Sequence, residues 1–219
     1  MSAARVALVT GASRGLGFSV ARALAGQDVQ VWAMARTQGA LEELDDCIAQ
    51  DGGLRPTLLP MDITDNAALE RVADAIHQRH GRLDLLVHCA IHAPHLSPVT
   101  HLDAKTLDRA FAINARAVQS LLRVIDPLFG AAEAPAAIFM TDSQDGKALW
   151  SPYHATKDAG IAFARAYAAE REKTGVIAHF HRPPPMPTAT RARFYPSEDR
   201  TKLTPCAEVA QGVVSLVLG

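Results

Sequence analysis

A tyrosine and a lysine spaced four residues apart are the first candidates for chemistry. Tyr153 and Lys157 belong to the run YHATK, and a spacing of four places both side chains on one face of a helix. An ordinary phenol has a pKa of about 10, so at neutral pH it needs help to exchange protons efficiently. A neighbouring ammonium favours the phenolate, and lowering the pKa by roughly 3 units corresponds to about 4 kcal/mol. The pair is therefore a candidate proton donor, although a surface helix can carry the same spacing.

A glycine-rich run, TGASRGLG at residues 10–17, lies where a predicted strand passes into a predicted helix. Glycine adopts backbone angles that are closed to other residues, and it lets a pyrophosphate approach the backbone and the helix N-terminus. This context predicts a nucleotide-binding turn, and a tight turn without a ligand is the alternative. The glycine spacing is TGxxxGxG and not GxGxxG.

Two arginines lie where the identity of the nucleotide would be recognised. The second predicted strand, QVWAMA, leads into Arg36, and no acidic residue stands there to accept from the ribose hydroxyls as in enzymes that prefer NAD. Arg14 lies inside the glycine-rich run. Two guanidinium groups suit the 2′-phosphate of NADP(H), because their N–H forks match phosphate oxygens. The alternative is that both arginines are solvated surface residues.

Together, the TGxxxGxG turn and the YxxxK run resemble the short-chain dehydrogenase/reductase (SDR) family, and the resemblance covers essentially the whole chain. It implies an NADP(H)-dependent oxidoreductase that transfers a hydride between the nicotinamide and a small-molecule carbonyl or alcohol substrate. Tyr153 would then exchange a proton with the substrate oxygen, while Lys157 lowers the pKa of Tyr153 and binds the nicotinamide ribose. The hydride chemistry belongs to the cofactor, and the protein supplies placement and charge.

The resemblance implies two further catalytic residues. Asn114, in the run FAIN, matches an asparagine that holds a water between the lysine and solvent, and asparagine is otherwise a poor residue inside a helix. Ser143, in the run SQDG, matches the serine that orients the substrate carbonyl. The stretch from Ser143 to Tyr153 is a few residues shorter than in the family, so counting back from Tyr153 leaves Thr141 as the alternative.

The resemblance also implies a set of cofactor-binding residues, with two departures from the family pattern. The family's NNAG is replaced by HCAI, so Ile91 adds bulk where the backbone usually lies close to the cofactor. The usual Pro-Gly after the sixth strand is replaced by Pro183-Pro184, which removes an N–H group. The expected set is Gly11, Ser13, Arg14, Gly15, Leu16, Gly17, Arg36, Asp62, Ile63, Cys89, Ala90, Ile91, Tyr153, Lys157, Pro183, Pro184, Met186 and Thr188.

The elements that must position these residues follow from the hydrophobic pattern. Apolar runs alternate with stretches of helical period, which is typical of βαβ units and a parallel sheet. Strands are expected at Val6–Thr10, Gln30–Ala35, Thr57–Pro60 and residues 83–89, 136–141 and 176–181. Helices are expected at Gly15–Ala25 and residues 40–50, 66–80, 103–129, 152–173 and 207–218. Asp65 or Asn66 is the expected N-cap of the third helix, and Pro152 fits the first turn of the fifth.

This order predicts an α/β fold, a three-layer Rossmann-like doubly wound parallel sheet with helices on both faces. It forms one NAD(P)-binding domain over residues 1–219, in which residues 187–205 are expected to serve as a substrate lid. The basic residues of that segment could meet an anionic substrate, but a solvated, mobile loop is the favoured interpretation. Because the chain stops after its last helix, the family's last strand is expected to be lacking.

Composition and net charge limit the classes of partner and the cellular compartment that are expected. The formal net charge is −1, so neither a nucleic-acid nor a membrane partner is expected. Three cysteines without a CxxC pair fit a reduced, cytoplasmic protein, and the N-terminal run is too short for a signal peptide. No metal is expected, because the spacing of His88, His92, His95 and His101 matches no known set of metal ligands. The helices expected at residues 103–129 and 152–173 resemble the family's dimer-forming pair, which implies a homodimer or homotetramer.

Two other functions remain open at this point. A catalytically impaired protein of this fold, acting as an NADP(H)-binding sensor or partner subunit, is suggested by the altered NNAG and Pro-Gly positions. The intact Tyr153, Lys157 and Asn114 favour the enzyme instead. An isomerase or epimerase is a third hypothesis, because a fold does not fix a function.

Overall fold

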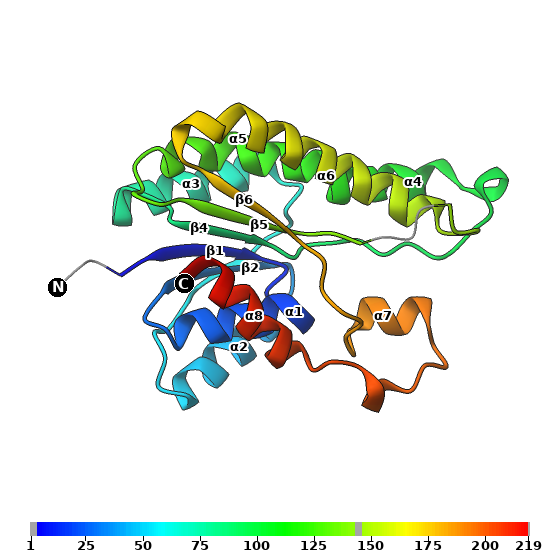
Figure 1. Cartoon of the computed structure of the whole chain (residues 1–219), viewed down its shortest axis with the longest axis horizontal. Coiled ribbons are helices and arrows are strands. Elements are labelled where there is room, and N and C mark those ends of the chain that lie inside the picture. Colours follow the sequence, from blue (N-terminus) through cyan, green and yellow to red (C-terminus); the bar gives the residue numbers. More distant parts are fainter. Residues whose placement is uncertain (1–3, 143–145, 219) are drawn as a thin grey trace.

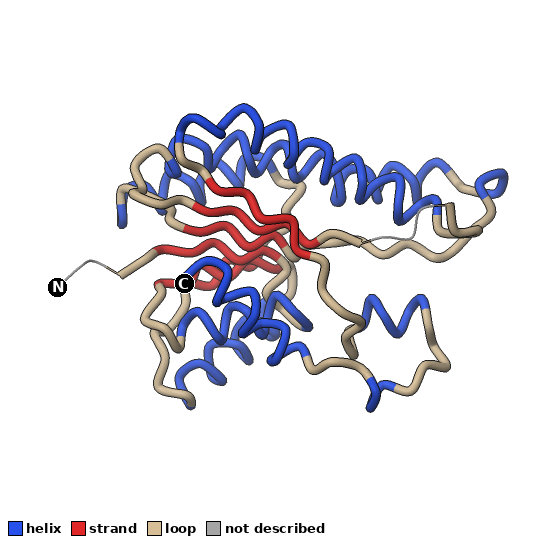
Figure 2. The backbone as a smooth tube through the Cα atoms, viewed as in Figure 1, coloured by secondary structure: helices blue, strands red, loops and turns tan. Residues whose placement is uncertain are grey.

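Six parallel strands form the central sheet of the computed structural model, which describes residues 4–142 and 146–218. Their order across the sheet is β3-β2-β1-β4-β5-β6 (Figures 1 and 2). The strands are β1 (Val6–Thr10), β2 (Gln30–Ala35), β3 (Thr57–Pro60), β4 (Leu85–His88), β5 (Ala136–Met140) and β6 (Ile177–His181). The predicted doubly wound sheet, with six strands in the described residues, is confirmed.

Helices cover both faces of this sheet (Figure 1). One face carries α1 (Gly15–Ala25), α2 (Gln38–Gln50) and α8 (Cys206–Leu218). The other carries α3 (Asn66–His80), α4 (Ala104–Phe111), α5 (Ala117–Phe129) and α6 (Ser151–Arg171). Asp65 caps α3, since its side chain accepts a hydrogen bond from the Ala68 backbone, and Pro152 lies in the first turn of α6. Both agree with the sequence analysis. None of the helices described is long and apolar enough to cross a lipid bilayer.

Each face of the sheet has its own hydrophobic core. Val9 and Leu24 belong to the core on one face, and Leu8, Trp32 and Phe129 belong to the core on the other. Because successive side chains of a strand point to opposite faces, a strand covered on both sides must be apolar throughout. All five residues of β1 are accordingly buried. This double burial explains why the sequence shows unbroken apolar runs instead of alternation.

The carboxyl ends of the strands meet at one edge of the sheet, where the candidate residues gather. β1 pairs with β2 on one side and β4 on the other, so Thr10 lies opposite both Met34 and His88. The winding direction reverses between these neighbours, and such a switch point leaves a crevice beyond the strand ends. The glycine-rich turn follows β1 directly, and therefore opens into this crevice.

The helix predicted over residues 103–129 is present without a break, but it is not α-helical throughout. α4 ends at Phe111, η2 (Ala112–Arg116) is a π-helix, and α5 begins at Ala117. A π-helical turn inside a helix often accompanies a functional position, and Asn114 lies in this one. Hydrophobic periodicity could not reveal it, because the turn depends on contacts with segments distant in the sequence.

One such contact is with Gly160 of α6. A Cβ atom added to Gly160 would lie 2.0 Å from the main-chain oxygen of Asn114 and 3.3 Å from Val118 Cγ2. Real Cβ atoms do not approach an oxygen so closely, so no other residue fits there without moving backbone. The absent side chain lets α6 lie directly against η2.

The segment 187–205 is also more regular than a loop. It contains α7 (Ala189–Phe194), whose N-cap Thr188 accepts a hydrogen bond from Arg191 N at 3.1 Å, and η4 (Arg200–Lys202). Other ends differ from prediction by one or two residues, as for β4, which spans Leu85–His88 and not residues 83–89.

Replacing Gly160 by alanine should destabilise the fold by about 1–3 kcal/mol or more, because the added methyl group overpacks the contact with η2. Gly212→Ala is the matched control. Gly212 lies inside α8, and an added Cβ there meets nothing within 4 Å. Alanine should therefore stabilise α8 by about 0.5–1 kcal/mol through its better helix propensity. Urea unfolding measures both changes, and equal effects at the two positions would contradict the close packing of α6 on η2.

Candidate active site

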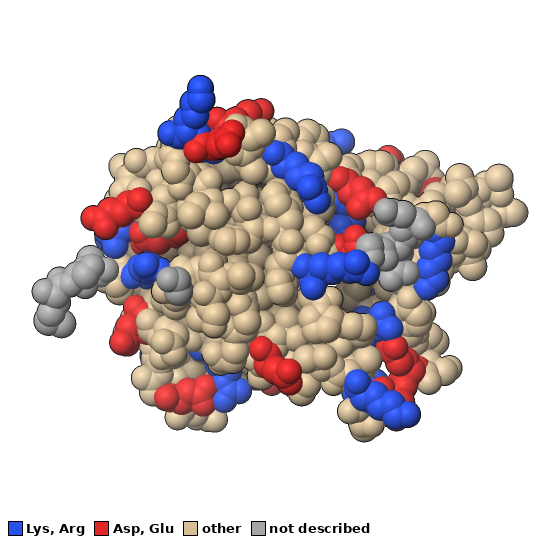
Figure 3. Space-filling model, viewed as in Figure 1, with Lys and Arg blue, Asp and Glu red and all other residues tan. Residues whose placement is uncertain are grey.

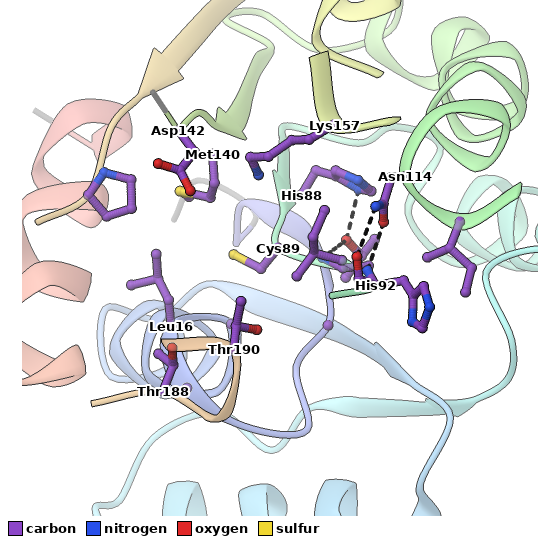
Figure 4. A pocket seen from close by; sticks show the side chains of 18 of the residues that line it. Leu16, His88, Cys89, His92, Asn114, Met140, Asp142, Lys157, Thr188 and Thr190 are labelled. Carbon is purple, nitrogen blue, oxygen red and sulfur yellow. Dashed lines mark hydrogen bonds between the residues drawn. The ribbon is translucent and has the colours of Figure 1, made fainter. Parts of the chain in front are cut away.

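A cavity of about 680 Å³ opens beyond the carboxyl ends of the strands. Every described residue of the predicted catalytic and cofactor-binding sets borders it, including Thr141. Ser143 lies outside the described residues. The cavity is formed by the glycine-rich turn, the ends of β1, β2, β4 and β5, the start of α6 and residues 182–195, and Figure 4 shows part of its lining.

The glycine-rich turn is built so that only glycine fits at two positions. A Cβ on Gly11, whose φ is +70°, would lie 2.8 Å from Ala90 N. A Cβ on Gly17 would lie 2.4 Å from the oxygen of Gly11. α1 begins at Gly15, and its N-cap residue Arg14 makes no side-chain cap. Free N–H groups of the first helical turn are a ready site for an anion, so this turn fits a pyrophosphate.

Arg14 and Arg36 both border the cavity and are exposed, and neither forms an ion pair with any residue that the structure describes. Near them, Asp62 accepts hydrogen bonds from the backbone and the hydroxyl of Thr64 at 2.9 and 2.8 Å. Burial opposes ionisation of Asp62, but these two bonds and the charges of Arg36 and Arg109 hold its pKa below the ordinary value. This end of the cavity therefore offers two free guanidinium groups and one fixed carboxylate.

Tyr153 and Lys157 lie on α6, with Tyr153 only 4% exposed. Lys157 Nζ is 5.9 Å from the centroid of the Tyr153 ring, and no hydrogen bond joins these two described side chains. Burial raises the pKa of Tyr153 well above its ordinary value, and the carboxylates of Asp142 and Asp158 add to the rise. Burial also lowers the pKa of Lys157. Burial and these carboxylates therefore act against the expected lowering of the Tyr153 pKa by Lys157, whose ammonium lies over the phenol ring.

Asn114 is 3% exposed, and its amide is used to join three segments. Its Oδ1 accepts from His92 N at 2.7 Å, and its Nδ2 donates to His92 O at 2.9 Å (Figure 4). Nδ2 also donates to Thr156 Oγ1 at 2.9 Å. Thr156 directly precedes Lys157 in α6. Asn114 thereby fixes the segment after β4 against the helix that carries Tyr153.

Thr141, the alternative to Ser143, is held at the end of β5. Its N–H and its hydroxyl both donate to the His181 oxygen, at 2.7 and 3.2 Å. The hydroxyl is therefore engaged with main chain and poorly placed to donate to a substrate. Next in the chain, Asp142 borders the cavity, and its side chain points toward the same part of it as Lys157 (Figure 4).

The two family departures have different structural outcomes. Ile91 packs against the aromatic side chains of Trp150, Tyr153 and Phe194, and it also borders the cavity. Pro184 is exposed at the cavity margin.

Of the residues that replace the family's two asparagines, His88 is buried and Cys89 is half-buried, and both are neutral. His88 Nδ1 lies 3.0 Å from Thr10 Oγ1, which also accepts from Ala90 N at 3.2 Å. Burial, with a smaller effect of the Lys157 charge, lowers the pKa of His88 to about 4. Burial raises the pKa of the Cys89 thiol to about 12. Neither group is therefore charged at neutral pH.

Sequence reasoning missed a group of aromatic side chains that border the cavity. Trp150, Phe194 and Tyr195 border the cavity together with Tyr153, and Trp150 and Phe194 are 3% and 9% exposed. The signal was present as Trp150 just before YHATK and as the run RFY at residues 193–195. The run RFY was overlooked because the segment that contains it was interpreted from its charged residues.

The charged side chains of this segment are largely exposed, as expected, and several of them also form hydrogen bonds and ion pairs. Arg191 donates twice to Glu198 at 2.6 Å, and Arg193 donates to Ala93 O at 2.9 Å. Arg200 donates to Pro187 O at 2.8 Å. Figure 3 shows basic and acidic side chains next to one another around α7, which fits these pairings.

Comparison with known proteins identifies the class. The sequence pattern of the family described as short chain dehydrogenase matches residues 5–199, and the chain belongs to this family. It is 30% identical over 186 residues to a benzil reductase ((S)-benzoin forming) of Saccharomyces cerevisiae, covering 80% of this chain and 68% of the relative. It is 31% identical over 170 residues to an NADPH-dependent pterin aldehyde reductase of Arabidopsis thaliana, covering 77% and 69%.

The fold comparison agrees. A short chain dehydrogenase from Escherichia coli CFT073, solved in complex with NADPH, superimposes with a TM-score of 0.92 at 26% identity. The superposition covers 98% of this chain and 90% of that one. The predicted family and fold are therefore confirmed, and the chain is an oxidoreductase of the short chain dehydrogenase class.

The buried His88 should make the protein sensitive to acid. Its pKa falls from 6.5 to about 4 on folding, so between these pH values the unfolded chain binds a proton that the folded chain does not. The free energy of unfolding should therefore fall by about 2–3 kcal/mol from this residue between pH 7 and about pH 4.5. His88→Asn should lose that part of the pH dependence in urea unfolding.

His77→Asn serves as the control, because His77 is exposed on α3. The expected result is a pH profile like that of the unmodified chain for His77→Asn and a flatter one for His88→Asn. Parallel profiles for all three proteins would show that His88 does not titrate as its burial requires.

Proposed function

We propose that this chain is an NADP(H)-dependent oxidoreductase that interconverts a carbonyl group and an alcohol of a small molecule. The observation that carries the proposal is that Tyr153 and Lys157 border the same cavity as a glycine cradle and two unpaired arginines, Arg14 and Arg36. The E. coli relative is complexed with NADPH, and the Arabidopsis relative is described as NADPH-dependent, which supports the same cofactor here.

The residues present fit a dinucleotide with a 2′-phosphate. The pyrophosphate is assigned to the N-terminus of α1, where Gly11 and Gly17 leave room for it. Arg14 and Arg36 are assigned to the 2′-phosphate. Asp62 and Ile63 are assigned to the adenine. The rest of the dinucleotide is assigned to the other cofactor-binding residues that border the cavity, which are Ser13, Leu16, Cys89, Ala90, Ile91, Lys157, Pro183, Pro184, Met186 and Thr188.

The nicotinamide, when bound, supplies or accepts the hydride. Tyr153 exchanges the proton with the substrate oxygen, and its raised pKa keeps the hydroxyl protonated at neutral pH. That state is a proton donor, so it favours reduction of the carbonyl. Lys157 is assigned to the ribose hydroxyls, and Asn114 to the proton relay. Ser143 is assigned to orienting the carbonyl, because the hydroxyl of Thr141 already donates to His181 O.

The proposal extends to the lid, the compartment and the assembly. Residues 187–205 are assigned to covering the substrate, since α7 places Phe194 against Tyr153 at a ring separation of 4.9 Å. A reducing, cytoplasmic compartment is supported by three cysteines that are all unpaired. A homodimer or homotetramer is supported by the apolar side chain of Phe163, 47% exposed on α6 beside α5.

Arg36→Ala should weaken NADPH binding by about tenfold to a hundredfold, because a hydrogen-bonded charge pair contributes roughly 1.5–3 kcal/mol. NADH lacks the 2′-phosphate, so its weaker binding should stay the same within about twofold. Nicotinamide fluorescence measures both affinities. Arg22→Ala is the control, because Arg22 is an exposed arginine of α1 paired with Asp51 and does not border the cavity. An equal loss for both nucleotides would remove the 2′-phosphate assignment.

Tyr153→Phe should lower turnover by about a hundredfold to ten-thousandfold while leaving NADPH binding nearly unchanged, because the variant lacks only the exchangeable proton. The measurement is NADPH oxidation across a panel of aldehydes and ketones. Tyr167→Phe makes the same change on the same helix at a residue whose hydroxyl donates to Asp126 at 2.8 Å and does not border the cavity. It should retain turnover. Turnover that survives in Tyr153→Phe would rule out the assigned proton donor.

A further inference from the structure

Four aromatic side chains, Trp150, Tyr153, Phe194 and Tyr195, form a continuous surface that we call the aromatic wall. The rings of Trp150 and Phe194 are 4.5 Å apart and tilted by 43°, and those of Tyr153 and Phe194 are 4.9 Å apart and tilted by 65°. Tyr195 lies 5.7 Å from Trp150. Such tilted and edge-on contacts are favourable aromatic geometries, so the wall is preorganised.

The aromatic wall lies beside the proposed proton donor and borders the cavity. Ile91, Ala93 and Leu96 pack against the same rings and extend the apolar surface. The glycine-rich turn at residues 10–17 borders the same cavity. A substrate oxygen that reaches the Tyr153 hydroxyl brings its neighbouring substituent beside these aromatic and aliphatic side chains, because Tyr153 is itself part of the wall.

Lys147 and Arg191, two cations beside the aromatic wall, already have partners. Lys147 Nζ donates to the Tyr195 hydroxyl at 2.7 Å and lies 4.4 Å from the centroid of the Trp150 ring. The Arg191 guanidinium stacks 3.8 Å over the Tyr195 ring and is paired with Glu198. These cations are thus engaged in stabilising the wall, and the carboxylate of Asp142 at the cavity margin disfavours an anionic substituent.

We propose that the substrate is an uncharged ketone or aldehyde with an aromatic ring next to the carbonyl, and that the aromatic wall binds this ring. The inference rests on the proposed function and names the substrate class of that site. A polyhydroxylated substituent would place its hydroxyl groups against hydrocarbon and lose hydrogen bonds to water without replacement. An aryl substituent gains aromatic contacts and loses little hydration.

The test compares 1-phenylpropane-1,2-dione with hexane-2,3-dione, which are both vicinal diones and differ in carrying an aryl or an alkyl group. With NADPH, kcat/KM for the aryl dione should exceed that for the alkyl dione by about tenfold or more. Phe194→Leu and Trp150→Leu keep the wall apolar but remove a ring, so each should reduce this ratio at least severalfold. Comparing ratios between proteins cancels the intrinsic reactivity of each dione.

Phe18→Leu is the control, because Phe18 is half-buried on α1, packs against the core on that face and does not border the cavity. It should leave the ratio unchanged. Far-ultraviolet circular dichroism shows whether each variant folds, and two independent ring removals keep the test valid if one of them does not. A ratio near one in the unmodified chain, or an unchanged ratio in every folded wall variant, overturns the inference.

A binding measurement separates this inference from the proposed function. Calorimetric titration of 1-phenylpropane-1,2-dione into the NADP⁺-loaded Tyr153→Phe protein requires no turnover. Binding that is weakened severalfold by an added Phe194→Leu supports the aromatic wall even if no carbonyl is reduced. Absence of binding, or binding indifferent to Phe194→Leu, overturns it even if the chain reduces other carbonyls.

Discussion

The amide of Asn114 holds together three segments that lie far apart in the sequence. Through hydrogen bonds to His92 and Thr156 it connects the π-helical turn, the segment after β4 and the start of α6. Both amide hydrogens are donated in hydrogen bonds in the interior, where an unpaired donor would lower the stability of the fold by about 1–3 kcal/mol. We call these hydrogen bonds the Asn114 clamp. The orientation of α6, and hence the position of Tyr153 and Lys157, depends on this clamp. The missing side chain of Gly160 makes the clamp possible by letting α6 approach the turn.

The sheet and the glycine-rich turn could be predicted from the sequence because their signals are local. An unbroken apolar run such as residues 6–10 marks a buried strand by itself, and glycines at 11, 15 and 17 mark the turn. The π-helical turn could not be predicted, since it exists only through contacts with His92, Thr156 and Gly160. α7 was equally hidden. It has six residues, and it relies on the Thr188 cap and on the pairing of Arg191 with Glu198.

The electrostatics of the site show why residue type alone is a poor guide to protonation. A tyrosine four residues from a lysine predicts a lowered phenol pKa. In the folded chain, burial of the phenol and the carboxylates of Asp142 and Asp158 reverse the sign. Neither the depth of Tyr153 nor the placement of these carboxylates can be inferred from a spacing of four. The same reasoning applies to His88 and Cys89, whose titration is governed by burial.

Most hydrogen bonds and ion pairs that shape the segment after β6 join residues that are close in the sequence. Thr188 caps Arg191, Arg191 pairs with Glu198, and Asp199 binds Thr201, so much of its shape is encoded within the segment. The clamp at Asn114 and the glycine cradle lie in other parts of the chain. In evolutionary terms, the segment can change its own internal bonds as long as its contacts with Ala93, Lys147, Trp150 and Tyr153 are kept. Residues 188–201 can diverge or be exchanged between paralogues, and so alter what the cavity accepts, while the frame that positions the reacting groups is inherited intact.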